Sequence, residues 1–155
     1  MRRFLFPIVC ALAVSISAAD ATSARLIKVL PHFLDREGRH ALSPSLYDRD
    51  AYQARLREHP ELRSGIRFDV QWRARTGRPT PLTLRLELRG SARGDLPTQV
   101  TLETRVQVDR SGAGGGWARL HLTGEDYRRF GELTAWRATL WDGETQVAEQ
   151  RSFLW

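Results

Sequence analysis

The chain has 155 residues, with 24 lysines and arginines against 18 aspartates and glutamates, and therefore a formal net charge of +6 at pH 7. Hydrophobic residues make up 41% of the chain and there is a single cysteine, so the composition is that of a globular protein and excludes a scaffold held by disulfides. A chain of this length suffices for one ordinary domain, which must be stabilised by a packed hydrophobic core.

Residues 1–21 have the features of a secretory signal peptide. A basic start at residues 1–3 precedes an apolar run over residues 4–16, and small residues with an Ala-x-Ala cleavage pattern follow at residues 19–21. The apolar run is shorter than the about 20 residues that span a bilayer. We therefore expect an exported, periplasmic or extracellular protein whose mature chain begins near Thr22, contains no transmembrane segment and forms a single domain over residues 22–155.

A first strand is predicted over residues 26–33. Its apolar residues Ile27, Val29 and Phe33 share one phase of the strand alternation. Pro31 cannot donate a hydrogen bond to a neighbouring strand, so this strand is expected at the edge of a sheet.

One short helix is predicted over residues 45–59, as an insertion between the first and second strands. Ser45 can cap its N-terminus, Tyr52 and Leu56 lie one turn apart, and Pro60 ends it. A single helical turn is expected later in the chain, at residues 124–130.

From Ile66 onward, the apolar residues recur with a period of two, which predicts half-buried strands. The glycine-rich run from Gly112 to Gly116 is predicted to be a flexible hairpin loop. Asp142-Gly143 predicts a type I′ hairpin turn between the last two strands. The later strands are expected over residues 66–75, 82–89, 100–109, 117–122 and 133–141, and from residue 144 onward.

Seven short strands with glycine or proline turns predict an all-β fold, a sandwich of two antiparallel sheets. The run Phe68-Asp-Val-Gln-Trp72 resembles the second strand of fibronectin type III domains, and Gly124-Glu-Asp-Tyr127 is similar to the corner before the sixth strand of immunoglobulin-like domains. The resemblance covers roughly residues 66–155 and implies an immunoglobulin-like β-sandwich. The chain departs from that pattern in lacking an inter-sheet cysteine pair and in carrying about 30 residues with a helix between the first two strands.

No catalytic, cofactor-binding or metal-binding residue is predicted. The four histidines never fall at ligand spacing, and no nucleophile elbow occurs. The glycines at residues 112–116 lead into a strand that begins at Trp117, whereas a phosphate-binding loop leads into a helix. An enzyme is therefore only the third interpretation of this sequence.

The last hairpin has apolar residues on both faces. If Trp136 faces inward, then Leu133, Ala135 and Trp141 lie on the opposite face of the same strand. Either the segment of residues 41–62 covers that second face or another molecule does. The interaction surface predicted for the second case comprises Trp141, Trp155, Tyr47, Tyr52 and Leu56, with Arg78 and Arg93 at its rim.

The function predicted from these features is a non-catalytic binding or accessory module that contacts another envelope or extracellular protein. The alternative is a binder of anionic polysaccharide or envelope lipid that uses the arginine-bearing faces of the sheets. Nucleic acid is a weaker interpretation, because it needs exposed stacking aromatics and most aromatics here fall in the inward phase.

Overall fold

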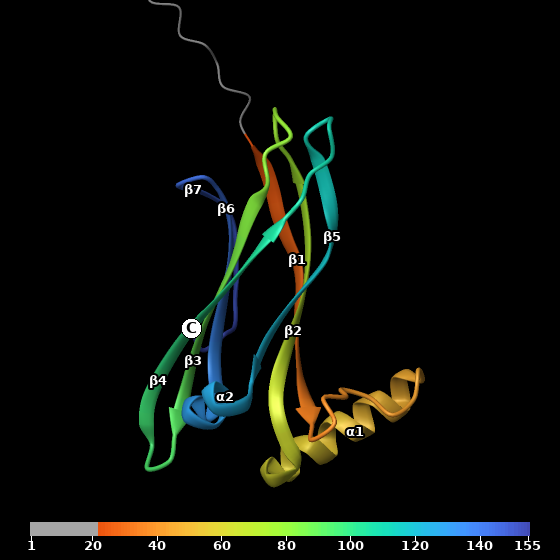
Figure 1. The fold of residues 1–155 in the computed structure, drawn as a ribbon, viewed down its shortest axis with the longest axis vertical. Coiled ribbons are helices and arrows are strands. Elements are labelled where there is room, and N and C mark those ends of the chain that lie inside the picture. The colour runs from red at the N-terminus through yellow and green to blue at the C-terminus, as the bar shows by residue number, and fades with distance from the viewer. Residues whose placement is uncertain (1–21) are drawn as a thin grey trace, which may run out of the picture.

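The computed structural model describes residues 22–155, so the signal peptide predicted for residues 1–21 lies outside the described residues. Seven strands form two antiparallel sheets, with the strand orders β1-β2-β5 and β4-β3-β6-β7, and residues of both sheets share one hydrophobic core (Figure 1). The all-β prediction is confirmed, and the arrangement is compatible with a β-sandwich. The elements are β1 (Ser23–Asp35), α1 (Leu46–Glu58), the 3₁₀ turn η1 (Pro60–Leu62), β2 (Arg63–Arg75), β3 (Leu82–Ala92), β4 (Leu96–Val106), β5 (Ala113–Thr123), α2 (Gly124–Phe130), β6 (Glu132–Asp142) and β7 (Thr145–Arg151).

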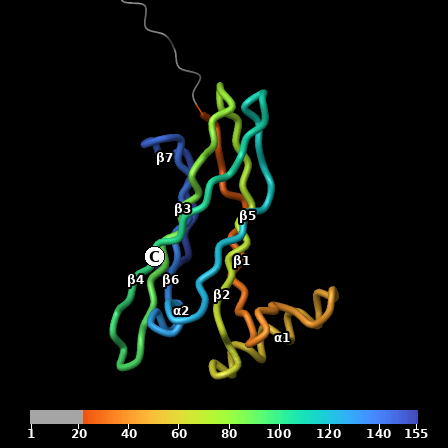
Figure 2. Tube along the Cα trace, viewed as in Figure 1, coloured from red at the N-terminus to blue at the C-terminus, as the bar shows by residue number. Residues whose placement is uncertain are grey.

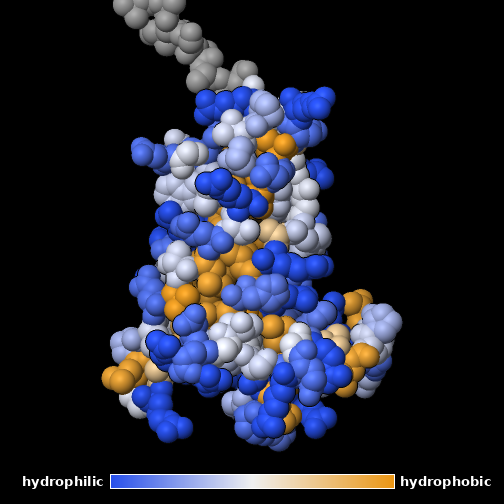
Figure 3. All heavy atoms as spheres, in the orientation of Figure 1, coloured by the Kyte–Doolittle hydropathy of each residue, from blue (hydrophilic) through white to orange (hydrophobic). Residues whose placement is uncertain are grey.

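The core is built mainly from the inward residues of β2 and β3, which alternate with outward polar residues as the period of two predicts. Each of these inward side chains is at most 5% exposed. On the side of β4 and β5, the sheets leave a hollow lined in part by Val100, Leu102 and Phe130, and Figure 3 shows an apolar strip along the middle of the molecule. The inward residues are Ile66, Phe68, Val70 and Trp72 of β2 and Leu82, Leu84, Leu86 and Leu88 of β3.

β1 is an edge strand, as Pro31 predicts, but its alternation is broken. The pairing of β1 with β2 shifts register between Leu26 and Lys28, so Ile27 is turned outward and is 36% exposed. The prediction that Ile27 shares the inward phase of Val29 is therefore wrong, because a β-bulge reverses the phase of the strand.

A second bulge lies between β3 and β6. The register shifts where Arg89 and Gly90 face Ala135 and Leu133, and Leu133 packs against the core. Leu133 therefore does not lie on the outer face with Trp141, as the uninterrupted alternation predicts.

Two of the predicted turns differ in detail. Asp142 pairs with Thr145 as the last residue of β6, so the turn residues are Gly143 and Glu144, and only Gly143 has a positive φ, of 59°. Glycine with a positive φ at the first central position is typical of a type II′ turn. The prediction of a type I′ turn at Asp142-Gly143 was therefore wrong in the type of the turn, and it placed the turn one residue too early.

The glycine-rich run forms part of a strand and is not the flexible loop that we predicted. β5 begins at Ala113, and Gly114, Gly115 and Gly116 pair with β2. A Cβ atom on Gly114 would lie 2.9 Å from Cη2 of Trp72, so glycine is needed there for the indole ring to fit.

The helical insertion forms as the sequence predicts. The Ser45 side chain accepts a hydrogen bond from the Asp48 N–H and caps α1, and Figures 1 and 2 show α1 at one end of the sheet β1-β2-β5. Among residues 22–155, no helix is both long enough and apolar enough to cross a membrane.

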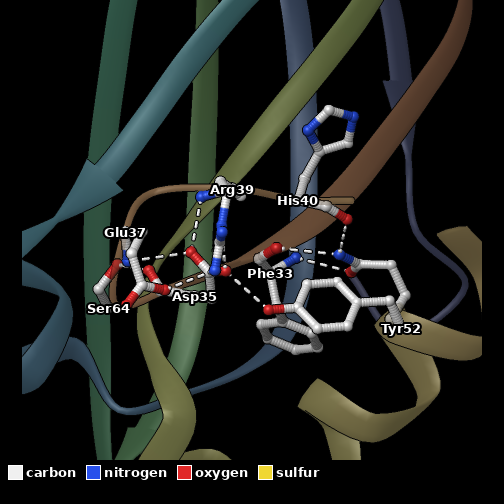
Figure 4. A network of polar contacts seen from close by, with 8 residues as sticks. Phe33, Asp35, Glu37, Arg39, His40, Tyr52 and Ser64 are labelled. Atoms are coloured by element: carbon white, nitrogen blue, oxygen red, sulfur yellow. Dashed lines mark hydrogen bonds and ion pairs between the residues drawn. The ribbon is translucent and has the colours of Figure 1, made fainter. Parts of the chain in front are cut away.

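A buried carboxylate ties the insertion to the end of β1 (Figure 4). Asp35 is 3% exposed, and its oxygens accept hydrogen bonds from the backbone N–H groups of Glu37 and Arg39 (3.0 and 2.7 Å), from Arg39 Nε (2.9 Å) and from the Tyr52 hydroxyl (2.7 Å). Burial acts to raise the pKa of Asp35, but the hydrogen bonds from Tyr52 and Arg39 outweigh it and lower the pKa to about 2.

The buried amide of Gln53 provides the second attachment. Its oxygen accepts from the Phe33 N–H at 2.9 Å, and its nitrogen donates to the carbonyl oxygens of Phe33 (2.9 Å) and His40 (2.8 Å). Beside it, Leu56 is 0% exposed. α1 is therefore docked onto β1 through one apolar and two polar anchors.

We predict that Asp35→Asn destabilises the fold by about 2 kcal/mol at pH 7, because it removes the charge that four donors address. The folded-state pKa of Asp35 lies below its ordinary value of 3.8, so this stabilisation is present above about pH 4 and is lost as the pH falls toward 2. Urea unfolding of both proteins at pH 7, 4 and 2.5 measures it, and the difference should shrink with acidification.

The exposed Asp126→Asn is the matched control and should change stability by less than about 0.5 kcal/mol at every pH. A pH-independent deficit in Asp35→Asn would contradict the electrostatic account.

Candidate binding surface

The outer face of the sheet β1-β2-β5 is strongly basic. Residues directly opposite each other on paired strands point to the same face, so the observed register aligns five rows across the three strands. The rows carry six basic residues and one acidic residue, Asp69, and we call this face the basic track. Its rows are Ser23, Arg75 and Ala113; Arg25, Arg73 and Gly115; Lys28, Gln71 and Trp117; Leu30, Asp69 and Arg119; and His32, Arg67 and His121.

Most of this positive charge has no acidic partner. Arg25, Lys28, Arg73 and Arg75 are exposed, and none of them forms an ion pair with another residue in the range 22–155. Asp69 is occupied by Arg67, whose Nη2 lies 2.7 Å from Oδ2. Four cationic side chains are therefore available to an anionic ligand.

The outer face of the other sheet also carries arginines, and two of these are paired with glutamates. Arg85 donates to Glu103 at 2.6 Å, and Arg137 lies 2.7 Å from Glu87. Arg89, which has no acidic partner there, lies 4.0 Å from the ring centre of Trp155. Arg105 and Arg151 are also exposed on this face without an acidic partner in the described chain. The two faces therefore differ in their acidic residues, because this face carries Glu87, Glu103 and Glu149, whereas the five rows of the basic track carry Asp69 alone.

Trp117 is the exposed tryptophan of the basic track. Its side chain is 48% exposed, whereas the neighbouring Trp72 is 5% exposed in the core. Trp117 lines two hollows, one that extends along Ser23–Ile27 and Gln71–Arg75, and a smaller one that reaches beneath Arg49 of α1. Both hollows therefore border this indole, and the larger one is also lined by the acidic Asp109.

Two histidines border the smaller hollow. The rings of His32 and His40 lie 5.4 Å apart between centroids. Burial lowers the pKa of both imidazoles, the charges of Arg67 and Arg49 lower it further, and Asp69 acts in the opposite direction. Both rings are therefore uncharged at neutral pH.

The structure brings three of the predicted interaction residues together, on the face opposite the basic track. Trp141 and Trp155 both lie there, with Arg85 4.9 Å from the ring centre of Trp141 and Arg137 4.9 Å from that of Trp155. Arg78 lies near the end of the same hairpin, 3.7 Å from Asp142.

The other four predicted residues lie elsewhere. Leu56 is buried, so it cannot belong to an open surface. Tyr52 is half-buried, and its hydroxyl group donates to Asp35. Tyr47 is 82% exposed at the start of α1, and Arg93 is exposed in the turn between β3 and β4, at the opposite end of the molecule from Arg78 (Figure 1). The predicted surface is therefore not assembled as one patch.

The outer face of the last hairpin is covered in part by the C-terminal residues and not by the segment of residues 41–62. Ser152 exchanges hydrogen bonds with the backbone of Trp136, and the chain then turns so that Trp155 lies over Arg89 and Arg137. α1 packs against β1 instead. The helix that we expected over this face lies at the end of the other sheet.

Sequence reasoning missed Trp117 as a surface residue. Strand alternation does place it in the same phase as Arg119 and His121, and that phase is the signal that could have identified it. Its neighbours across the sheet, Lys28 and Gln71, depend on the strand order and register, which the sequence does not show.

Within the part of the chain that the structure describes, no three His, Cys, Asp or Glu side chains gather closely enough to hold a metal ion. No protein-family model, no curated protein and no solved structure matches this chain.

We predict that Trp117→Ser lowers the free energy of unfolding by only about 1–2 kcal/mol, because about half of the residue is already exposed to water. Trp72→Ala should cost about 3–5 kcal/mol, the usual loss for a large core aromatic. Urea unfolding measures both, and acrylamide quenching should show that Trp117→Ser removes the most readily quenched fluorescence. Equal losses of stability would mean that the two faces of the sheet are assigned wrongly.

Proposed function

We propose that this protein is a non-catalytic binding module that holds an anionic polysaccharide along the basic track. The observation that carries the proposal is the row of exposed cations without acidic partners beside the exposed Trp117. A guanidinium binds a carboxylate or sulfate through two parallel hydrogen bonds. The electron-rich face of an indole packs against the apolar face of a sugar ring.

The shape of the basic track favours a polymer over the other anions. Both of its hollows border Trp117, so several units of an extended chain can contact it at once. Single-stranded nucleic acid needs successive aromatic platforms, and Trp117 is the one aromatic residue, apart from the histidines, in the five rows. A lipid surface is met by a cluster of protruding apolar side chains, whereas the exposed Ile27, Leu30 and Trp117 stand among six basic residues.

We also propose that the fold is an immunoglobulin-like β-sandwich. The support is its strand order, in which β2 is central to a three-stranded sheet and β3 and β6 are central to a four-stranded one. The leader predicted over residues 1–21 supports an exported protein that works in the periplasm or outside the cell. Polysaccharides are abundant in both places.

The test is binding of soluble polygalacturonate, measured by calorimetry at about 50 mM salt, where electrostatic contacts are strong. Arg25→Gln combined with Arg73→Gln should weaken binding about tenfold or more, because charge-assisted hydrogen bonds to the polymer are lost. Affinity should also fall with added salt.

Arg105→Gln combined with Arg151→Gln is the matched control. These two exposed arginines lie on the outer face of the other sheet, so the control removes the same charge and should leave binding within about twofold. Equal weakening by both pairs would show that net charge, and not the basic track, attracts the polymer.

A protein partner is the second candidate. It is favoured by the exposed apolar residues Leu42 (60%), Leu46 (65%) and Tyr47 (82%) before and at the start of α1. Contact with an envelope or extracellular protein through these residues would be insensitive to salt. Leu46→Ser combined with Tyr47→Ser should abolish such contact and leave polygalacturonate binding unchanged.

A further inference from the structure

The smaller hollow of the basic track is assembled from segments that lie far apart in the sequence. His40 and Arg49 come from the insertion, and the other lining residues come from β1, β2 and β5, among them Trp117 and Arg119. The hollow has a volume of about 250 Å³. Since liquid water occupies about 30 Å³ per molecule, this is the space of about eight waters, which suits one sugar ring.

The insertion holds its side of the hollow in place. Gln53 donates to the His40 carbonyl oxygen at 2.8 Å and also bonds to Phe33 of β1 at both backbone groups. Arg49 lies on the same helix and is partly buried, with a side chain 34% exposed. The hollow is therefore a preformed feature, and its walls do not have to be ordered by a ligand.

The polar groups in and beside the hollow favour an acidic partner. Asp69 Oδ1 accepts no hydrogen bond within the described chain, but it exposes almost no surface, so a ligand in the hollow does not reach it. The guanidinium groups of Arg49 and Arg119 lie 3.6 Å from Asp50 and 3.8 Å from Asp69, at ion-pair but not at hydrogen-bond distance. The side chain of Arg119 is 67% exposed. A complementary ligand therefore carries an acidic group to which both guanidinium groups can donate.

An acidic sugar ring fits this hollow better than phosphate or sulfate alone. Trp117 adds an aromatic face, which a pyranose ring can cover and a small inorganic anion cannot.

We propose that this hollow is the specificity subsite of the basic track and holds one carboxylate-bearing sugar ring. Trp117 packs against the ring, and Arg49 and Arg119 bind its carboxylate from α1 and β5. The inference rests on the proposed function, since the rest of the polymer would lie along the larger hollow past Arg25 and Arg73.

The neighbouring histidines give the subsite a pH dependence. His32 and His40 face Asp69, Arg67, Arg49, Arg119 and each other, so in the free protein a net positive surrounding and burial keep both rings neutral. A bound carboxylate adds a negative charge and raises the pKa of both rings. Binding then takes up protons, and affinity should rise as the pH falls from about 7.5 to about 5.5.

The test uses trimeric oligouronides of galacturonate, glucuronate and mannuronate, with a neutral galactose trimer and inorganic phosphate as further probes. Calorimetry should show that at least one oligouronide binds and that the neutral trimer binds at least tenfold more weakly. Arg49→Gln combined with Arg119→Gln, and separately Trp117→Ser, should each weaken the acidic trimer about tenfold. Arg105→Gln combined with Arg151→Gln again serves as the control for lost charge.

The outcomes separate the subsite from the proposed function. If polygalacturonate binding is lost with Arg25 and Arg73 but survives the Arg49, Arg119 and Trp117 substitutions, the subsite is overturned and the binding module stands. If phosphate competes as well as the acidic trimer does, recognition of a sugar ring is overturned in favour of a general anion site. If neither oligouronides nor the polymer bind, both proposals fail.

Discussion

The burial of the inward face of β2 is the constraint on which the rest of the structure depends. β2 is the central strand of its sheet, paired to β1 on one side and β5 on the other, and its inward residues from Ile66 to Trp72 are at most 5% exposed. Each such side chain contributes roughly 1.5–3 kcal/mol when it leaves water. A slip of one residue would turn Arg67, Asp69 and Arg73 into the core. The packing of the core therefore also determines which charged residues lie together on the outer face.

Trp72 extends this constraint to β5. A side chain on Gly114 would collide with the indole, and a Cβ atom on Gly115 would lie 3.2 Å from the Trp72 carbonyl oxygen. Glycine at residues 114 and 115 allows the core to pack. The absence of a side chain at residue 115 also leaves the backbone of β5 uncovered on the outer face just before Trp117. The larger hollow is lined by this backbone, and the exposed indole stands at its end. The buried tryptophan thus explains the glycine at residue 114.

The features that follow from local sequence could be predicted, and those that depend on pairing could not. The strand alternation of β2 and β3 and the cap at Ser45 are local, and they are observed as predicted. The outward turn of Ile27 arises from a bulge, which exists only relative to a neighbouring strand. The basic track could not be predicted because its rows require the order and register of three strands. The prediction of a shared surface for Leu56 and Trp141 was wrong, because it placed the insertion over the wrong sheet.

The distribution of acidic residues, and not the net charge, determines where an anion can bind. An arginine that already contacts a carboxylate must lose that contact to bind a ligand, so Arg85 and Arg137, held by Glu103 and Glu87, offer little net gain. The unpaired arginines of β1 and β2 lose only water. The net positive charge is thus greater on the face of β1, β2 and β5 than on the face of the other sheet. The anchors Asp35 and Gln53 place α1 at the end of that same face, where Arg49 closes the smaller hollow. An insertion that departs from the expected pattern of a β-sandwich is for this reason the part of the chain best placed to give the face its selectivity.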